Sequence, residues 1–339
     1  MPAVKPRPGS EGGGPSLSHY GDCHAVVMGA AGFVGRWVSR VLTASGARLT
    51  LMVRDRAEAE RVFGTYGVRG EIVEVDLERL DQVAATLGAV RPSITFNLAA
   101  YGVDRSQQDE AKALRLNADL PRAVCHALAP MRDPAWHGRR LVHAGSAAEY
   151  GATADGDVSE ESEPRPATPY GRSKTSGTRI VAERSRALGL GSVTARVFWA
   201  YGPGERPGRL LPSLLRLPET LEPLPLTSGT QERDFVYVED VAEALLRLGL
   251  THGAPGEVVN VASGRLVSVR RFAETAADVL GVDHARLQFG ARPTEPDTPV
   301  HRPVPLERLR SLTGWTPPTA IDDGIRRTVE FERARARRS

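Results

Sequence analysis

Cysteine, long apolar runs and net charge are all scarce in this sequence. Only two of its 339 residues are cysteines, Cys23 and Cys125, and neither has a CxxC or metal-ligand spacing. We therefore expect reduced thiols, a cytoplasmic protein and no metal site. No run of about 18 apolar residues is present, which excludes a membrane-spanning helix, and we expect no signal peptide. The net charge of +3 gives no basis for nucleic-acid binding.

The composition otherwise indicates a globular protein with irregular ends. Apolar residues make up 41% of the chain and charged residues 25%. Nine of the first 22 residues are Gly or Pro, so we expect a disordered tail over 1–22. At the other end we expect a basic tail over 331–339, at a solvated helix end.

Short apolar runs alternate with segments of helical periodicity up to residue 198. The apolar runs predict strands at 25–28, 48–53, 71–75, 94–98, 141–144 and 193–198. Helices are predicted between them, for example over 81–87 and 108–128. This alternation implies an α/β fold with a doubly wound parallel sheet, covered by helices on both faces.

The pattern changes after Phe198. Six prolines fall between residues 203 and 225, which excludes a long helix there. Helices are predicted again over 238–250 and 269–280. We expect a first domain over 23–198 with a returning segment near 234–262, and a smaller C-terminal lobe over 199–233 and 263–330.

A glycine-rich turn follows the first predicted strand. Gly29, Gly32 and Gly35 form a GxxGxxG pattern directly before a predicted helix. The free N–H groups and dipole of a helix start attract a pyrophosphate, and the glycines permit a tight turn and close packing. This context favours the dinucleotide site of a Rossmann-type sheet, which Phe33 and Val34 would join. An ordinary glycine-rich turn is the alternative.

The end of the second predicted strand bears on the choice of dinucleotide. Arg54 and Arg56 flank Asp55 there. A guanidinium can bind a 2′-phosphate, whereas a carboxylate binds the ribose hydroxyls. The two arginines favour NADP(H), with NAD(H) possible, unless both merely solvate a loop.

Tyr170 and Lys174 are spaced by one helical turn. Thr168 as N-cap and Pro169 as first residue would start a helix, placing both side chains on one face. A nearby ammonium stabilises phenolate and would lower the pKa of the tyrosine from about 10. This spacing is common by chance, but with the glycine turn it indicates a general acid/base.

Together these motifs resemble the extended short-chain dehydrogenase/reductases, in their nucleotide-sugar epimerase, dehydratase and 4-ketoreductase branch. The resemblance covers roughly residues 25–329. Besides the glycines and the Tyr170/Lys174 pair, it is carried by Asp76-Leu77, Asn97-Leu98-Ala99-Ala100, Ser146, Arg196-Val197-Phe198, Tyr201-Gly202-Pro203, Arg233-Asp234-Phe235-Val236-Tyr237-Val238 and Gly314-Trp315-x-Pro317. It implies an NAD(P)-binding Rossmann domain and a nucleotide-sugar-binding lobe.

The resemblance also assigns cofactor-binding positions. Asp76 and Leu77 would contact the adenine, while Leu98, Ala99 and Ala100 would line the cofactor cleft. All five lie at or just after the ends of predicted strands, at the edge of the sheet where the glycine turn is expected.

Catalytic and substrate-binding roles follow from the same resemblance. Tyr170 would be the general acid/base, Lys174 would bind the nicotinamide ribose and tune Tyr170, and Ser146 would hydrogen-bond the reacting sugar oxygen. Arg233 would bind the nucleotide diphosphate, unless it forms a surface salt bridge with a neighbouring carboxylate. Arg292 could be a second phosphate contact.

The residues after Ser146 depart from the family's dehydratases. Those enzymes have Thr-Asp-Glu or Thr-Ser-Glu here, with carboxylates that eliminate water, whereas this chain has Ala147 and Ala148. Glu149 falls one place late and would point the other way if strand alternation continued. Sugar dehydration is therefore not expected.

A 4-ketoreductase and a 4-epimerase remain. Arg54 and Arg56 favour the reductase, which consumes NADPH, over the epimerase, which keeps tightly bound NAD. Trp199 stands where 4-epimerases have asparagine; it either packs on an apolar deoxysugar face or fills space between the lobes. We expect NADPH-dependent reduction of the 4-keto group of a nucleotide-activated 6-deoxy sugar, with the epimerase as the alternative.

Two other classes fit the sequence less well. A reductase of apolar ketones has no need for Arg233, and a non-catalytic NADP sensor needs neither Tyr170 nor Lys174. The resemblance also implies a homodimer, formed through the helix that carries Tyr170 and the preceding one near 117–128.

Overall fold

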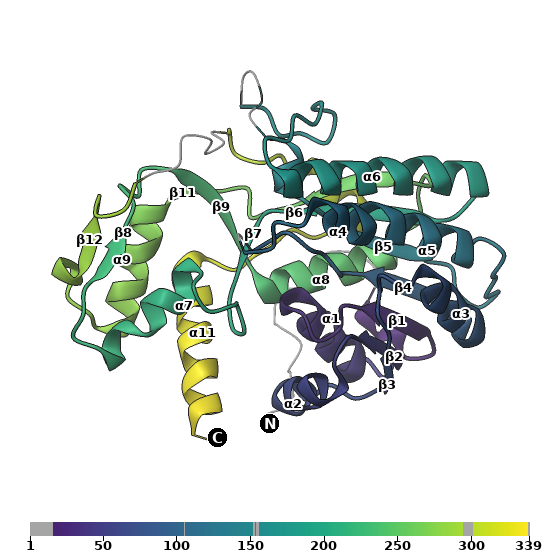
Figure 1. Ribbon diagram of the computed structural model, residues 1–339, viewed down its shortest axis with the longest axis horizontal. Helices are drawn as coiled ribbons and strands as arrows, with labels where there is room; N and C mark the ends of the chain where they lie inside the picture. The colour runs from purple at the N-terminus through teal and green to yellow at the C-terminus, as the bar shows by residue number, and fades with distance from the viewer. Residues whose placement is uncertain (1–15, 105, 152, 154–155, 294–300, 338–339) are drawn as a thin grey trace.

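Seven parallel strands form the central sheet of the computed structural model, which describes residues 16–104, 106–151, 153, 156–293 and 301–337 (Figure 1). The strands are β1 His24–Met28, β2 Arg48–Val53, β3 Glu71–Glu74, β4 Ile94–Asn97, β5 Leu141–Ser146, β6 Ser192–Val197 and β10 Glu257–Val261. Their order is β10-β6-β5-β4-β1-β2-β3, and every neighbouring pair is parallel. The strand order therefore reverses direction between β1 and β4.

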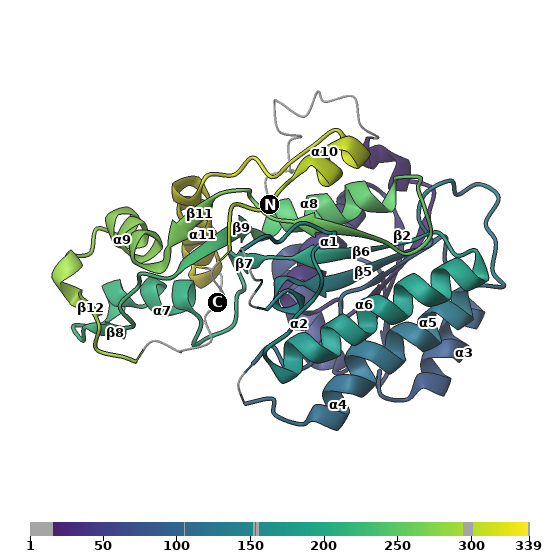
Figure 2. The same cartoon turned by 90° about the horizontal axis from the view of Figure 1, so that it is seen from above.

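Helices cover both faces of this sheet (Figure 2). One layer holds α1 Phe33–Ala44, α2 Arg56–Tyr66 and α8 Val238–Gly249; the other holds α3 Leu80–Val90, α5 Leu120–Leu128 and α6 Pro169–Leu188. Helix α4 Glu110–Leu114 and a π-helical turn, Arg115–Asp119, lead into α5, and α10 Glu307–Thr313 packs on β10 and α8. None of the helices in the described residues is long and apolar enough to cross a bilayer. The predicted doubly wound α/β fold is confirmed.

Strand β1 shows why the sheet needs two helical layers. Its side chains alternate between the faces, so Ala25 and Val27 join the core under α1 and α8, while Val26 and Met28 join the core under α3, α5 and α6. All four are fully buried. A strand with four successive apolar residues, two on each face, can be stable only between two layers.

The C-terminal part of the chain builds two smaller sheets beside the central one (Figure 1). Strands β7 Trp199–Tyr201, β9 Glu232–Tyr237 and β11 Leu266–Ser268 form one; β8 Leu224–Leu226 and β12 Leu287–Phe289 form the other. Helices α7 Leu210–Leu215, α9 Val269–Leu280 and α11 Ile321–Ala336 pack with them around a separate core. In that core the rings of Phe235 and Phe272 stack 4.2 Å apart. As the prolines predicted, α7 is short.

The N-terminal segment differs from the expected tail. Residues 1–15 lie outside the described residues, but Leu17–Tyr20 form a 3-10 helix. Tyr20 is fully buried against Phe96 and Trp136, and its hydroxyl donates to the Leu246 carbonyl oxygen at 2.7 Å. The expectation of disorder was therefore wrong for residues 17–20, because one aromatic side chain docks on the sheet core.

The expected basic tail likewise begins inside a helix. Helix α11 continues to Ala336, and the ring of Phe331 packs 5.6 Å from Trp37 and 5.1 Å from Tyr66. These contacts join α11 to the first helical layer of the central sheet.

The contacts of Tyr20 lead to a stability prediction. Tyr20→Ala should lower the free energy of unfolding by about 3–5 kcal/mol, since it empties a filled core position. Tyr20→Phe should cost only about 1 kcal/mol, because it removes one hydrogen bond and keeps the ring. Urea unfolding measures both, and two variants with the wild-type midpoint would show that this segment does not contribute to the fold.

Candidate active site

The glycine turn lies at the carboxyl edge of the sheet, where the strand order reverses between β1 and β4. Gly29 adopts φ +73°, a conformation that favours glycine. A Cβ at Gly35 would lie 2.1 Å from the Gly29 carbonyl oxygen, so only glycine lets α1 pack against the turn. Helix α1 begins after Gly32, which has no side chain to cap the first N–H groups. The turn therefore fits a pyrophosphate, as predicted.

The loop after β4 connects this turn to the predicted acid/base. A Cβ at Gly29 would lie 3.0 Å from the backbone of Ala99, and the Leu98 N–H donates to the Met28 carbonyl oxygen at 3.1 Å. Further along, a Cβ at Gly102 would lie 3.4 Å from the ring of Tyr170. The loop thus runs directly from the glycine turn to Tyr170.

The remaining predicted cofactor positions lie at the same edge. Phe33 and Val34 are half-buried in the first turn of α1, and Ala100 is exposed after β4. Asp76 is exposed after β3 and accepts the Glu78 N–H at 3.0 Å, which leaves its other carboxylate oxygen available. Half-buried Leu77 packs on the core under α3.

The two arginines after β2 have different environments. Arg56 begins α2 and donates from Nη2 to the Ile72 carbonyl oxygen at 2.5 Å. Arg54 is exposed and has no hydrogen bond or ion pair with the rest of the described chain. Between them, Asp55 caps α2 by accepting the Glu58 N–H at 2.8 Å. Arg54 is therefore the arginine that is free to meet a ligand.

Helix α6 starts as predicted, with Thr168 as N-cap and Pro169 as first residue. It lies very close to its neighbours, because two of its residues have no side chain. A Cβ at Gly171 would be 2.4 Å from the Ala148 carbonyl oxygen, and one at Gly177 would be 2.0 Å from that of Asn117. These contacts hold α6 against the end of β5.

Tyr170 and Lys174 both face β5 from this helix. Lys174 is 1% exposed, and its ammonium donates to the Ala144 carbonyl oxygen at 2.5 Å. Two residues further along β5, Ser146 lies close enough to the phenol of Tyr170 to lower its pKa. The structure thus brings the three predicted catalytic side chains together.

The protonation of this pair differs from the expected one. Burial raises the pKa of Tyr170 to about 12, although the hydrogen bond from Ser146 and the positive charge of Arg209 oppose the rise. Burial also lowers the pKa of Lys174 to about 8. The expectation that Lys174 brings the phenol pKa toward neutrality was wrong, because desolvation of both groups is the dominant effect. Near neutral pH the phenol keeps its proton.

Asn117 belongs to the site but has no recognisable motif. It is fully buried in the π-helical turn before α5, and its side-chain NH₂ donates to Ser173 Oγ at 2.9 Å and to the Tyr101 carbonyl oxygen at 2.7 Å. Ser173 in turn donates to the Tyr170 carbonyl oxygen. Asn117 therefore links the loop after β4 to the helix that carries the acid/base.

Glu149 corrects another expectation. The chain leaves β5 in a 3-10 turn, Ala147–Glu149, so strand alternation does not continue. The carboxylate turns back: Oε1 accepts the Ser146 N–H at 2.8 Å and Oε2 accepts from Arg196 Nε at 3.0 Å. Glu149 is fully buried and Arg196 nearly so. A capping box, Ser146-x-x-Glu149, was the sequence signal that could have revealed this turn.

Trp199 and Arg233 meet in the three-stranded sheet. The guanidinium of Arg233 lies 4.5 Å from the centroid of the Trp199 ring and donates to the Glu232 carbonyl oxygen at 2.6 Å. Burial lowers the pKa of Arg233 to about 10. The adjacent Asp234 accepts from the backbone N–H and the hydroxyl of Ser263. Arg233 is a buried cation on an aromatic platform.

Arg292 follows strand β12. Its side chain is exposed, and its backbone N–H donates to the carbonyl oxygen of Leu226, the last residue of β8. Residues 294–300 that follow are outside the described part of the chain. The structure thus places Arg292 at the end of the two-stranded sheet.

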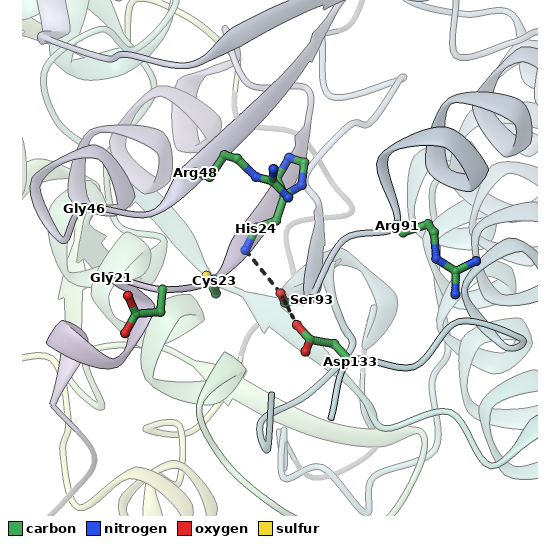
Figure 3. A pocket seen from close by; sticks show the side chains of 9 residues that line it. Gly21, Cys23, His24, Gly46, Arg48, Arg91, Ser93 and Asp133 are labelled. Atoms are coloured by element: carbon green, nitrogen blue, oxygen red, sulfur yellow. Dashed lines mark hydrogen bonds between the residues drawn. The ribbon is translucent and has the colours of Figure 1, made fainter. Parts of the chain in front are cut away.

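A pocket of about 400 Å³ lies at the opposite, amino-terminal edge of the central sheet (Figure 3). It is lined by residues that include His24, Arg48, Ser93 and Asp133. Ser93 donates to Asp133 at 2.6 Å and accepts the His24 N–H at 3.1 Å. None of the predicted site residues lines this pocket, which lies at the wrong end of the strands to serve them.

The fold and the residues at the carboxyl edge of the central sheet together define a protein of the extended short-chain dehydrogenase/reductase type. The family model described as NAD dependent epimerase/dehydratase family matches residues 25–262. The chain belongs to this family. The resemblance noted from its motifs is thereby confirmed.

Relatives that span nearly the whole chain differ in activity. The dTDP-6-deoxy-L-talose 4-dehydrogenase (NAD(P)(+)) of Kitasatospora kifunensis is 29% identical over 321 residues, which cover 91% of this chain and 95% of the relative. The UDP-glucose 4-epimerase of Mycolicibacterium smegmatis is 28% identical over 333 residues, covering 91% and 98%. The structure of MoeE5 in complex with UDP-glucuronic acid and NAD superposes with a TM-score of 0.77 at 27% identity, covering 92% and 99%.

The packing of Gly35 yields a test of the dinucleotide site. Gly35→Ala should abolish binding of NAD(P)H, because the new methyl group would collide with the backbone of the turn. Gly64→Ala is the matched control: Gly64 lies within α2 with no atom close to its would-be Cβ, so alanine there should stabilise by about 0.4–1 kcal/mol. Fluorescence titration with reduced cofactor measures binding. Equal affinity in both variants would contradict the assignment of this turn.

Proposed function

We propose that this chain reduces the 4-keto group of a nucleotide-activated 6-deoxy sugar, using NADPH. The observation that carries the proposal is the convergence of Ser146, Tyr170 and Lys174 at the end of β5, joined to the glycine turn by the loop after β4. When bound, the reduced nicotinamide would supply a hydride to the carbonyl carbon. The chain must then bind the ketone and deliver a proton to its oxygen.

The protonation states support reduction. With a pKa of about 12, the Tyr170 phenol carries its proton at neutral pH and can donate it to the developing alkoxide. With a pKa of about 8, Lys174 is mostly ammonium at pH 7 and can stabilise negative charge beside the phenol. Ser146, which lies beside Tyr170, would hold the same sugar oxygen.

The surroundings of Ser146 weigh against dehydration. Elimination of water needs a carboxylate acid and base next to the ketone, and Ala147 and Ala148 cannot transfer protons. The neighbouring carboxylate, Glu149, has one oxygen on Arg196 and the other on the Ser146 N–H. It is fully buried and so cannot reach a substrate.

Substrate class is proposed from Arg233, Trp199 and the relatives. The guanidinium of Arg233, held over the ring of Trp199, would bind a nucleotide diphosphate bidentately. The half-buried ring of Trp199 beneath it could contact an apolar face of the sugar. A 6-deoxy sugar nucleotide is also what the Kitasatospora relative's name specifies, and 4-dehydrogenation in reverse is 4-keto reduction. Arg292 would be a second phosphate contact.

The preference for NADPH is proposed from Arg54. It is exposed at the carboxyl end of β2 with no partner among the described residues, so it can turn to a 2′-phosphate. Arg56 would support it, although part of its guanidinium is used by the Ile72 carbonyl oxygen. A carboxylate at this position would favour NAD by binding its ribose hydroxyls, but the carboxylate of Asp55 caps α2 instead. NAD(H) stays possible, because the MoeE5 structure contains NAD.

A 4-epimerase with tightly bound NAD is the second candidate. It is supported by the mycobacterial 4-epimerase, of which 98% is covered at 28% identity. An epimerase must retain and regenerate its cofactor, whereas a reductase releases it each turnover. Stoichiometric NAD⁺ released from denatured protein would favour the epimerase, and little or no retained cofactor would favour the reductase.

We also propose a cytoplasmic homodimer. Both cysteines are buried free thiols, as in a reducing compartment. Pairing through α5 and α6 would add no residue to the site, which one chain already assembles.

Activity and the role of Tyr170 are tested together. Purified protein should oxidise NADPH when given a 4-keto-6-deoxy sugar nucleotide, followed by absorbance of the reduced cofactor. Tyr170→Phe should lower kcat by about 100-fold or more while cofactor binding is kept, because the proton donor is lost. Tyr20→Phe, the same change at the opposite edge of the sheet, should keep its activity. No oxidation with dTDP-, UDP- or GDP-linked ketosugars would contradict the proposal.

Cofactor choice is tested at Arg54. Arg54→Ala should raise KM for NADPH roughly tenfold and leave KM for NADH unchanged, since only the 2′-phosphate loses a charged partner. The control is Arg48→Ala, an exposed arginine at the other end of β2. If KM for both cofactors changes equally, Arg54 does not read the 2′-phosphate.

A further inference from the structure

A buried ion pair lies directly behind the proposed catalytic residues. The carboxylate of Glu149 and the guanidinium of Arg196 meet at 3.0 Å, with side chains 0% and 5% exposed. The other carboxylate oxygen of Glu149 accepts the N–H of Ser146 at 2.8 Å. The ion pair therefore contacts the backbone of Ser146, whose side chain lies beside Tyr170.

Stability alone does not account for this pair. The free energy lost when two charges leave water is often larger than the free energy of their attraction. Apolar residues of similar size often stabilise such a position at least as well. Arg196 is additionally fixed by the ring of Tyr150, 4.5 Å from its guanidinium carbon. The Glu149–Arg196 ion pair is thus held in place from both sides, and its carboxylate contacts the last residue of β5.

We infer that Glu149, held by Arg196, is a positioning residue that fixes Ser146 through its backbone N–H and places a buried negative charge at the end of β5 that Tyr170 and Lys174 face. This rests on the proposed reductase function, in which Tyr170 must be a phenol and Lys174 an ammonium. Glu149 itself touches neither substrate nor cofactor. Its negative charge extends to higher pH the range in which Tyr170 and Lys174 both keep their protons.

The charge of Glu149 acts in the same direction on Tyr170 and on Lys174. The negative charge of Glu149 raises the pKa of Lys174 and that of Tyr170, while burial sets the larger part of each shift. Other groups that could act on the pair come from every neighbouring element. They are His143 on β5, kept neutral near pH 7 by burial and Lys174; Arg196 on β6; Arg209 before α7; and the Arg172–Glu110 pair between α6 and α4 on the exposed side. Among these groups Glu149 is the buried carboxylate.

The test is Glu149→Gln, which keeps a hydrogen-bond acceptor for the Ser146 N–H and removes the charge. In the reductase, activity falls at high pH as Lys174 loses its proton. Without the carboxylate the pKa of Lys174 drops, so the alkaline limb of kcat against pH should move down by about 1 pH unit. A purely structural role would lower kcat at every pH and leave the limb in place, which would overturn the inference.

Two further variants separate charge from position. Glu149→Asp keeps the charge on a shorter side chain, so kcat should fall because Ser146 is held less well, with the limb unmoved. Glu257→Gln is the matched control: Glu257 pairs with Arg139, which is 1% exposed, at the amino end of β10. It should leave the pH profile unchanged, and a shift there equal to that of Glu149→Gln would contradict a local effect.

A readout without substrate distinguishes failure of this inference from failure of the proposed function. The chain has only three lysines, Lys5, Lys112 and Lys174, so ¹³C-lysine-labelled protein gives few signals, and Lys112→Arg and Lys5→Arg variants assign that of Lys174. Its titration midpoint should fall in Glu149→Gln relative to wild type. An unchanged midpoint overturns the inference, even if the reductase assay succeeds. A lowered midpoint upholds the charge effect even if every ketosugar fails.

A double variant keeps the inference testable if Glu149→Gln does not fold. If Glu149→Gln leaves an unpaired buried guanidinium that the fold does not tolerate, Glu149→Gln/Arg196→Met removes both charges. The Lys174 midpoint should again fall, because Glu149 is the charge that raises it. A double variant with the wild-type midpoint would overturn the inference.

Discussion

The site depends on how closely α6 approaches the end of β5. Gly171 and Gly177 have no side chains, and the carbonyl oxygens of Ala148 and Asn117 occupy the space that a Cβ would need. With α6 in this position, Lys174 reaches the Ala144 carbonyl oxygen and Tyr170 reaches Ser146. A methyl group at either glycine would displace the helix by more than a hydrogen bond tolerates. The arrangement is therefore a consequence of backbone packing before it is one of side-chain chemistry.

The same close packing decides the electrostatics. Tyr170, Lys174, Glu149 and Arg196 all lose water, and each responds according to its charge: burial raises the pKa of the phenol and lowers that of the ammonium. A buried carboxylate beside them favours the protonated form of both. The phenol is thus prepared to give a proton at neutral pH, which fits a ketone reductase better than an enzyme that begins by taking one.

Much of the fold could be predicted because its signals are local. The strand RLTLMV, residues 48–53, is apolar except at Arg48 and Thr50, and its predicted bounds match β2. The glycine-rich turn before α1 and the helix start at Thr168-Pro169 were also predicted correctly, because each depends on the conformation of a few adjacent residues. Strand β5 extends two residues past its predicted end, where Gly145 and Ser146 have no apolar signal.

The sequence by itself determined the parallel sheet, the turn that fits a pyrophosphate and the residues that form the candidate acid/base, because periodicity, glycine and spacing act within one element. Only the tertiary structure decided that Tyr20 docks on the core, that Glu149 turns back to Arg196 and that the phenol keeps its proton. Those outcomes depend on burial and on partners far away in the chain, such as Leu246, more than 200 positions from Tyr20. Desolvation and long-range pairing are properties of the packed chain, so no window of neighbouring residues contains them.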